Sequence, residues 1–145
     1  MWRAINSVKR LWLLGRAGIT SLEFALVSVL LFTLMFGITD LARYFLAWHG
    51  LNTISSEAAR VALTYHYANN SNWTFSCAAP TSGMAANVAA SAPFLDPNNL
   101  TLCVSPATAG GITTVSVTAS YPFSFMIPAL SAANGTLSAR TAISY

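Results

Sequence analysis

The hydrophobic pattern is densest near the N-terminus, where residues 24–39 lie between Glu23 and Asp40 and contain no charged residue. Together with residues 19–22, this run reaches the ~20 residues that a helix needs to cross the hydrocarbon core of a bilayer. Further along, apolar residues recur every three or four positions, as on one face of a helix; they are Leu41, Tyr44, Phe45, Trp48, Leu51, Ile54, Ala58 and Val61. No proline occurs before Pro80. We therefore expect one long helix over residues 19–67, with a transmembrane segment at about residues 19–39.

The pattern changes after residue 67. Residues 68–80 are rich in Asn and Ser and are expected to form a loop. Thr81 or Ser82 can cap a short second helix that ends at about Pro93. Three later runs alternate between apolar and polar residues, which predicts three strands with one buried face; they are residues 100–105, 114–121 and 137–144, with an apolar crossover at 122–130.

The expected fold class is therefore α+β. A long N-terminal helix packs on a small three-stranded antiparallel sheet, because a sheet that small needs a helix to cover its apolar face. The short second helix and the three strands together make residues 81–145 an α/β head.

Charge indicates how the apolar run is oriented. Only 8% of the residues are charged, against about 25% in a soluble domain, so the composition itself requires a membrane segment. Residues 1–18 hold four basic residues and no acidic one, whereas the rest of the chain has three arginines and four acidic residues. Because basic residues stay on the cytoplasmic side, residues 1–18 are expected to be a cytoplasmic leader, with everything after about Asp40 outside. A removable secretory signal peptide is the alternative, but the apolar run is long for one.

The basic residues are confined to the leader, so they do not indicate a nucleic-acid partner. Cys77 and Cys103 both fall in the part predicted to be outside the cytoplasm, where a disulfide between them can persist; two unpaired thiols are the alternative. They form no CxxC motif and no cluster with His49 or His66, so neither a metal site nor a cofactor is expected.

No enzyme motif is present in the sequence. GxSxG, HExxH and a Gly-rich phosphate loop are all missing, and the four acidic residues are scattered. We therefore expect a protein that is not an enzyme. Two acidic residues do have basic partners three positions away, Asp40 with Arg43 and Glu57 with Arg60, and both pairs are predicted to form salt bridges on the helix.

The leader ends in Gly18, and Glu23 follows four residues after Ile19 at the start of the apolar run. An intramembrane carboxylate costs on the order of 3 kcal/mol or more, so it normally has a partner. Cleavage between Gly18 and Ile19 would create one, the new α-ammonium of Ile19, in the same chain or a neighbouring one. Alternatively, Glu23 lies at the headgroup boundary and needs no partner.

This spacing of glycine and glutamate resembles that of type IV prepilins, and the chain is similar to the TadE-like pseudopilins and minor pilins of the Flp (tight adherence) pilus system. The resemblance covers residues 16–62 and rests on Gly18, the Glu23-Phe24-Ala25-Leu26 segment, Gly37 to Arg43, and the Ser56-Glu57-Ala58-Ala59-Arg60 run. Arg43 keeps its place in the family pattern, whereas Asp40, Leu41 and Ala42 depart from the commonest residues.

The resemblance implies a pilin-like fold and a processing pathway. A prepilin peptidase would cut between Gly18 and Ile19, and the helix would then leave membrane lipid to pack with other pilin and pseudopilin subunits at an inner-membrane pilus assembly platform. It also implies a single-pass protein of the bacterial inner membrane with a periplasmic C-terminal domain, extracellular once in the pilus, and a role in adhesion or biofilm formation. The alternative function is a membrane-tethered binding or sensor module unrelated to pili.

Overall fold

The computed structural model describes the backbone of residues 2–145 and the side chains of residues 19–128 and 130–145. It divides into an N-terminal unit, Met1–Thr39, and a C-terminal unit, Asp40–Tyr145. The predicted leader, residues 1–18, which includes Gly18 of the cleavage site, lies outside the residues whose side chains are described.

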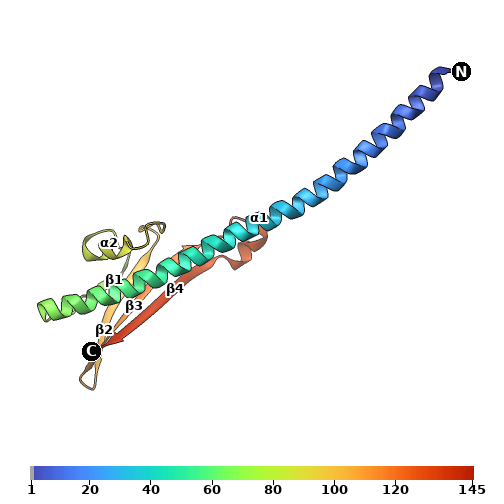
Figure 1. Cartoon of the computed structure of the whole chain (residues 1–145). Coiled ribbons are helices and arrows are strands. Elements are labelled where there is room, and N and C mark those ends of the chain that lie inside the picture. The colour runs from blue at the N-terminus through green and yellow to red at the C-terminus, as the bar shows by residue number, and fades with distance from the viewer. Residues whose placement is uncertain (1) are drawn as a thin grey trace. The chain divides into compact units, whose positions relative to one another are not determined.

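Helix α1 runs over Trp2–Asn69, so it begins well before residue 19, where the helix was predicted to start, and ends two residues after Tyr67 (Figure 1). The leader contains no proline, so no residue in it interrupts the backbone hydrogen-bond pattern. At the other end, Asn70 adopts the left-handed conformation with φ of 50°. Asn is one of the few residues that tolerate this conformation, and it is a common way to terminate a helix.

The polar side chains within the apolar part of α1 are satisfied inside the helix itself. The hydroxyls of Ser28, Thr33 and Thr39 donate to backbone carbonyls three or four residues earlier, at 2.7 to 2.9 Å. In lipid there is no water to accept such a hydrogen bond, so internal pairing removes the cost of an unsatisfied donor. These hydroxyls are therefore compatible with a membrane-spanning helix.

The sheet has four strands, and the prediction of three was wrong. Strands β1 (Phe75–Ala78), β2 (Thr101–Ala109), β3 (Ile112–Phe123) and β4 (Gly135–Ser144) pair antiparallel in the order β1-β2-β3-β4. The additional strand, β1, lies within the segment predicted to be a loop, residues 68–80. Its four residues are too few to establish an alternating pattern, and it is held by pairing with β2 along one edge of the sheet.

Strands β2 and β3 form one hairpin through Gly110 and Gly111, which both have positive φ, 59° and 83°. Two consecutive residues with positive φ fit the tight turns whose twist matches that of paired strands, and glycine adopts them without strain. Both strands extend further than the alternating runs indicated, because Pro106 and Pro122 are accommodated within them.

Helix α2 occupies only Gly83–Ala89 and stops before Pro93. The chain after it turns tightly, with the amides of Ser91 and Ala92 bonded to carbonyls three residues earlier. A residue that precedes proline is disfavoured in the helical conformation, which explains why the helix does not continue to Pro93. The predicted crossover between the second and third long strands contains a 3-10 helix, η1, at Pro128–Ala133.

The core of the C-terminal unit lies between α1 and one face of the sheet, with α2 adding to it (Figure 1). The helix contributes Leu51 and Ile54, both fully buried, together with small residues such as Ala58, Ala59 and Ala62. Small side chains let the helix approach the sheet closely. The strands contribute apolar residues that alternate along the chain, as predicted; they are Leu102, Val104, Val115, Val117, Ala119 and Ala139.

Strand β4 and the segments on either side of it contact α1 at several positions along the helix. Asp40 bonds to the chain just after β3, the hydroxyl of Ser55 meets that of Thr141 at 2.9 Å, and the ring of His66 packs on that of Tyr145 with centroids 4.4 Å apart. Contacts therefore run along α1 from Asp40 to His66, so the sheet is attached to the helix over most of the helical part of this unit.

Candidate functional site

The first component of the site is an exposed apolar surface on α1. Within the part of the chain that the structure describes, one helical stretch, Ile19–Asn69, is long and apolar enough to cross a membrane. Every large hydrophobic side chain between Ile19 and Ile38 is at least half exposed. Such a surface requires either lipid or other apolar helices around it.

The C-terminal unit has exposed apolar residues of its own on α1. The exposed large hydrophobic residues there begin with Leu41, Phe45, Leu46 and Trp48. After Trp48 the exposed positions of α1 become polar, and they include Asn52, Ser56 and Arg60. The apolar surface of α1 therefore ends near Trp48, about 12 Å beyond Asp40 at ~1.5 Å per residue.

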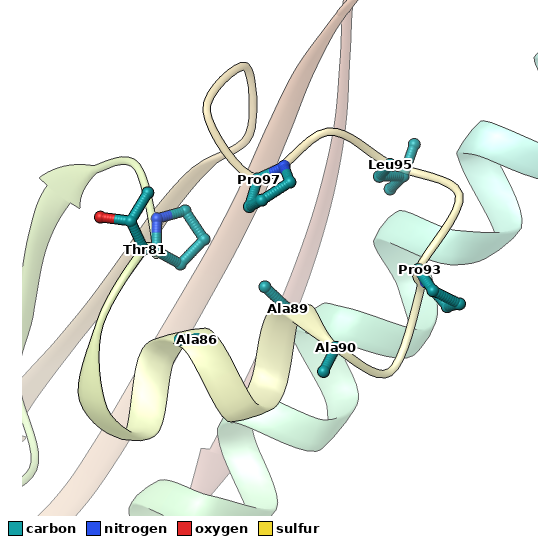
Figure 2. A pocket seen from close by; sticks show the side chains of 8 residues that line it. Thr81, Ala86, Ala89, Ala90, Pro93, Leu95 and Pro97 are labelled. Carbon is teal, nitrogen blue, oxygen red and sulfur yellow. The ribbon is translucent and has the colours of Figure 1, made fainter.

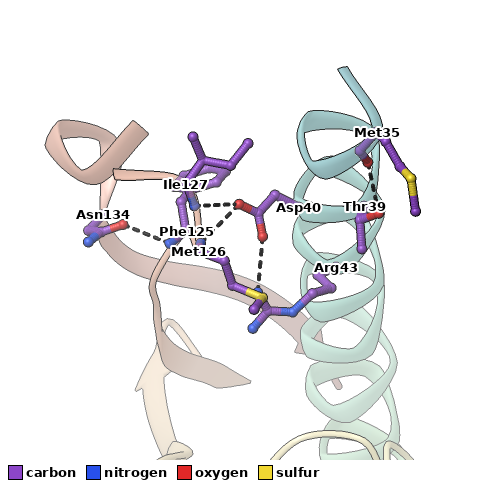
Figure 3. A network of polar contacts seen from close by, with 8 residues as sticks. All are labelled: Met35, Thr39, Asp40, Arg43, Phe125, Met126, Ile127 and Asn134. Atoms are coloured by element: carbon purple, nitrogen blue, oxygen red, sulfur yellow. Dashed lines mark hydrogen bonds and ion pairs between the residues drawn. The ribbon is translucent and has the colours of Figure 1, made fainter. Parts of the chain in front are cut away.

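Asp40 is the second component and is the most buried charged residue described, with only 1% of its surface exposed. Its Oδ2 accepts hydrogen bonds from the backbone amides of Met126 and Ile127 at 2.9 and 3.0 Å, and its Oδ1 accepts one from Nη1 of Arg43 at 3.1 Å (Figure 3). A buried carboxylate is tolerated only when such partners replace its hydration. We call this arrangement the Asp40 latch, because it joins α1 to the segment before η1.

The latch also orders the segment that it holds. The amide of Phe125 donates to Oδ1 of Asn134 at 2.8 Å, so three successive amides, 125 to 127, are bound by side-chain oxygens (Figure 3). Helix η1 begins at Pro128, directly after the two amides that Asp40 accepts. The carboxylate thus accepts hydrogen bonds from the two backbone amides that directly precede this short helix.

The guanidinium of Arg43 lies over one ring of an aromatic cluster. Its Cζ lies 5.7 Å from the ring centre of Phe123, and Tyr44 packs edge-on against Phe123 and stacked on Phe125. A cation over an aromatic face contributes about 0.5–1 kcal/mol at an exposed site. Arg43 keeps 46% of its side chain exposed, so it remains available to an external anion or headgroup.

The predicted ion pair between Asp40 and Arg43 is present at 3.1 Å. The amides of Met126 and Ile127, which lie 86 and 87 residues away in sequence, were not predicted as partners of Asp40. Backbone amides carry no residue-specific signal, so the sequence offered one clue only. That clue is Asp40 itself, an acidic residue at the end of an apolar run with only one basic residue close by in sequence, Arg43.

The other residues singled out from the sequence lie apart from the latch. Cys77 and Cys103 form a disulfide that joins β1 to β2, so the predicted pairing is confirmed. Glu57 and Arg60 form an exposed ion pair at 3.0 Å. Ile19 and Glu23 are both exposed on α1, and Gly18 lies outside the described side chains.

Two surface pockets of the C-terminal unit differ in size and lining. A shallow groove of about 310 Å³ is lined by Pro80, Thr81, Ala86, Ala89, Ala90, Pro93, Leu95 and Pro97 (Figure 2). A smaller one of about 160 Å³ lies beside Arg43 and Phe123. Among the described residues, no group of three His, Cys, Asp or Glu side chains could hold a metal ion.

Comparison with known proteins gives one family. Residues 18–60 match the family of TadE-like proteins, and this segment of the chain is TadE-like. No curated protein matches the chain, and no solved structure matches it. The matched segment contains Glu23, Asp40 and Glu57 with both arginine partners, whereas the sheet lies outside it.

Proposed function

We propose that this chain, with its TadE-like segment at residues 18–60, is a pseudopilin or minor pilin that takes part in assembly of a Tad-type (Flp) pilus. The observation that carries the proposal is the coincidence of that segment with the exposed apolar residues of α1, described from Ile19 onward, which precede a compact folded unit in the chain. Such a chain can be held in a membrane by its helix and later packed among other helices without refolding its sheet.

The proposed pathway begins with cleavage between Gly18 and Ile19 by a prepilin peptidase. The resulting α-ammonium of Ile19 would lie four residues from the exposed carboxylate of Glu23. In an apolar bundle this pairing is favourable, since neither charge can be solvated by lipid. The pair would then fix the axial position of one subunit against its neighbours, at an inner-membrane assembly platform.

In this proposal the chain has a structural role and no catalytic one. Its N-terminus is cytoplasmic and its C-terminal unit is periplasmic in a bacterial inner membrane, then extracellular if the subunit enters the pilus. Adhesion or biofilm formation would be properties of the assembled pilus. The supporting features are the basic residues of the leader and the disulfide of the C-terminal unit, which is typical of an oxidising compartment.

Processing provides the direct test. We would coexpress the full chain with its prepilin peptidase and determine intact mass and N-terminal sequence. The wild type should lose about 2 kDa, as expected for removal of an eighteen-residue leader, and begin at Ile19. Gly18→Leu should remain full length, whereas Gly15→Leu, a matched change three residues earlier, should be cleaved. Unchanged processing of Gly18→Leu would rule out the assignment.

A further inference from the structure

Exposed apolar side chains in the C-terminal unit gather near Asp40 from two separate segments. One is residues 41–48 of α1, described above. The other is residues 126–130, in which Met126 is 72% and Leu130 is 40% exposed. Scattered exposed hydrophobic residues are ordinary on a soluble protein, but a set collected at one end indicates a contact surface.

The Asp40 latch fixes the position of residues 126–130 next to α1. The amides of Met126 and Ile127 donate to the carboxylate of Asp40 (Figure 3). Both residues therefore lie beside Asp40, the first residue after the apolar run. The side chains of Met126 and Ile127 are not used by these hydrogen bonds. The latch therefore holds an apolar segment beside Asp40, the first residue of the C-terminal unit.

Charge is scarce in the same region. The sequence has no charged residue between Asp96 and Arg140, which includes the whole of residues 126–130. Asp40 itself is buried and paired, and Arg43 keeps a partly exposed guanidinium above an aromatic ring. An arginine with an apolar stem and a partly exposed charged end is suited to the headgroup level of a bilayer.

The dimensions of a bilayer favour lipid as the partner of this surface. Residues 19–39 are sufficient for the ~30 Å hydrocarbon core, and the headgroup regions bring the total to about 40–45 Å. Residues 41–48, which follow directly, extend about 12 Å, and this is comparable to one headgroup layer with its boundary. Trp48 ends the apolar surface, and tryptophan is enriched at the membrane–water interface.

We propose that residues 41–48 and the latched segment 126–130 lie in the outer interfacial layer of the bilayer, with Trp48 at its aqueous edge and Arg43 at the phosphates. The C-terminal unit is then partly immersed in the membrane surface. This inference rests on the membrane anchorage in the proposed function, but it does not depend on processing or on a pilus.

The test places a fluorescent probe at single positions of the full chain in vesicles of phosphatidylethanolamine and phosphatidylglycerol at low protein-to-lipid ratio. Met126→Cys is labelled with an environment-sensitive nitrobenzoxadiazole maleimide under non-reducing conditions, which preserve the Cys77–Cys103 disulfide. Leu34→Cys is the control within the span. Ile112→Cys is the control for water exposure, because Ile112 is 57% exposed beside the β2–β3 turn. Wild-type protein should take up no label if the disulfide is intact.

We expect the probe at residue 126 to be quenched by lipids with a shallow doxyl group, and to be several-fold less accessible to iodide than the probe at residue 112. Equal iodide access at 126 and 112, with Leu34 still quenched by lipid, would overturn the inference while leaving the anchor intact. Protection from iodide without quenching by doxyl lipid would mean that a second copy covers the segment, and would also overturn it. An aqueous probe at Leu34 would instead refute membrane anchorage and, with it, the inference.

Discussion

Gly50 lies against the ring of Phe94 so closely that a β-carbon on residue 50 would be 2.7 Å from Cζ of that ring and 3.2 Å from Cδ1 of Leu95. Gly50 thus permits close packing in the middle of α1, where a glycine otherwise weakens the helix by about 1 kcal/mol relative to alanine. Phe94 is 46% exposed, so its ring can move outward if space is needed.

Gly50→Ala should consequently stabilise the protein less in the wild type than in a Phe94→Ala background. Without the ring, the substitution should recover up to about 1 kcal/mol of helix propensity. With the ring present, displacement of Phe94 offsets that gain. Urea unfolding of the four members of this double-mutant cycle in detergent measures the coupling, expected at about 0.5 kcal/mol or more for residues in contact. Additive effects would show that the ring does not constrain residue 50.

Asp40→Ala should destabilise the C-terminal unit by about 3 kcal/mol, since hydrogen bonds to a charged acceptor contribute roughly 1.5–3 kcal/mol each and are only partly additive. The amides of Met126 and Ile127 should also lose protection from hydrogen exchange. Asp40→Asn, which retains an acceptor oxygen, should have a smaller effect.

Glu57→Ala is the matched control for Asp40→Ala, because it removes the other pair with the same spacing. That pair is exposed, with Arg60 at 76%, and its loss should cost under about 1 kcal/mol. If the two alanine substitutions lowered the free energy of unfolding equally, Asp40 would contribute no more to stability than one partner of an exposed salt bridge.

The disulfide should stabilise the sheet mainly by restricting the unfolded chain. Cys77 and Cys103 are separated by 26 residues, and closing a loop of that size is worth on the order of 3 kcal/mol. The double variant Cys77→Ser/Cys103→Ser should therefore unfold at a lower urea concentration, and reduction of the wild type should reproduce the shift. An unchanged midpoint in both experiments would contradict this prediction.

Glu23→Gln should separate processing from assembly. The carboxylate is exposed on α1 and is not at the cleaved bond, so the variant should still begin at Ile19 after coexpression with the peptidase. Its recovery with other pilin subunits should fall, because an amide cannot form an ion pair with the new ammonium. Glu57→Gln should be recovered like the wild type, and equal recovery of both variants would refute a role for Glu23 in assembly.

Local patterns predicted much of the fold. The three- and four-residue spacing from Leu41 to Val61 corresponds to α1, and three of the four strands follow alternating runs whose apolar members are buried or partly buried. The Asp40–Arg43 pair was predictable for the same reason, since both residues lie on one helical turn. In each case the signal and the structure belong to the same short segment.

The missed features depend on partners that are distant in sequence. Strand β1 exists because β2 pairs with it and Cys77 is bonded to Cys103, and neither fact is visible in the four residues of β1 itself. The main partners of Asp40 are amides, which every residue except proline possesses. Only the folded chain shows which of them the carboxylate reaches.

The spacing of the attachments along α1 has a mechanical consequence. Asp40 contacts the segment before β4, Ser55 contacts β4 itself, and His66 contacts Tyr145 directly after β4, at successive positions along the helix. A force applied along α1 from its Asp40 end would load these attachments together in shear instead of breaking them one after another. The C-terminal unit should therefore travel with the helix as a single body when the helix is pulled.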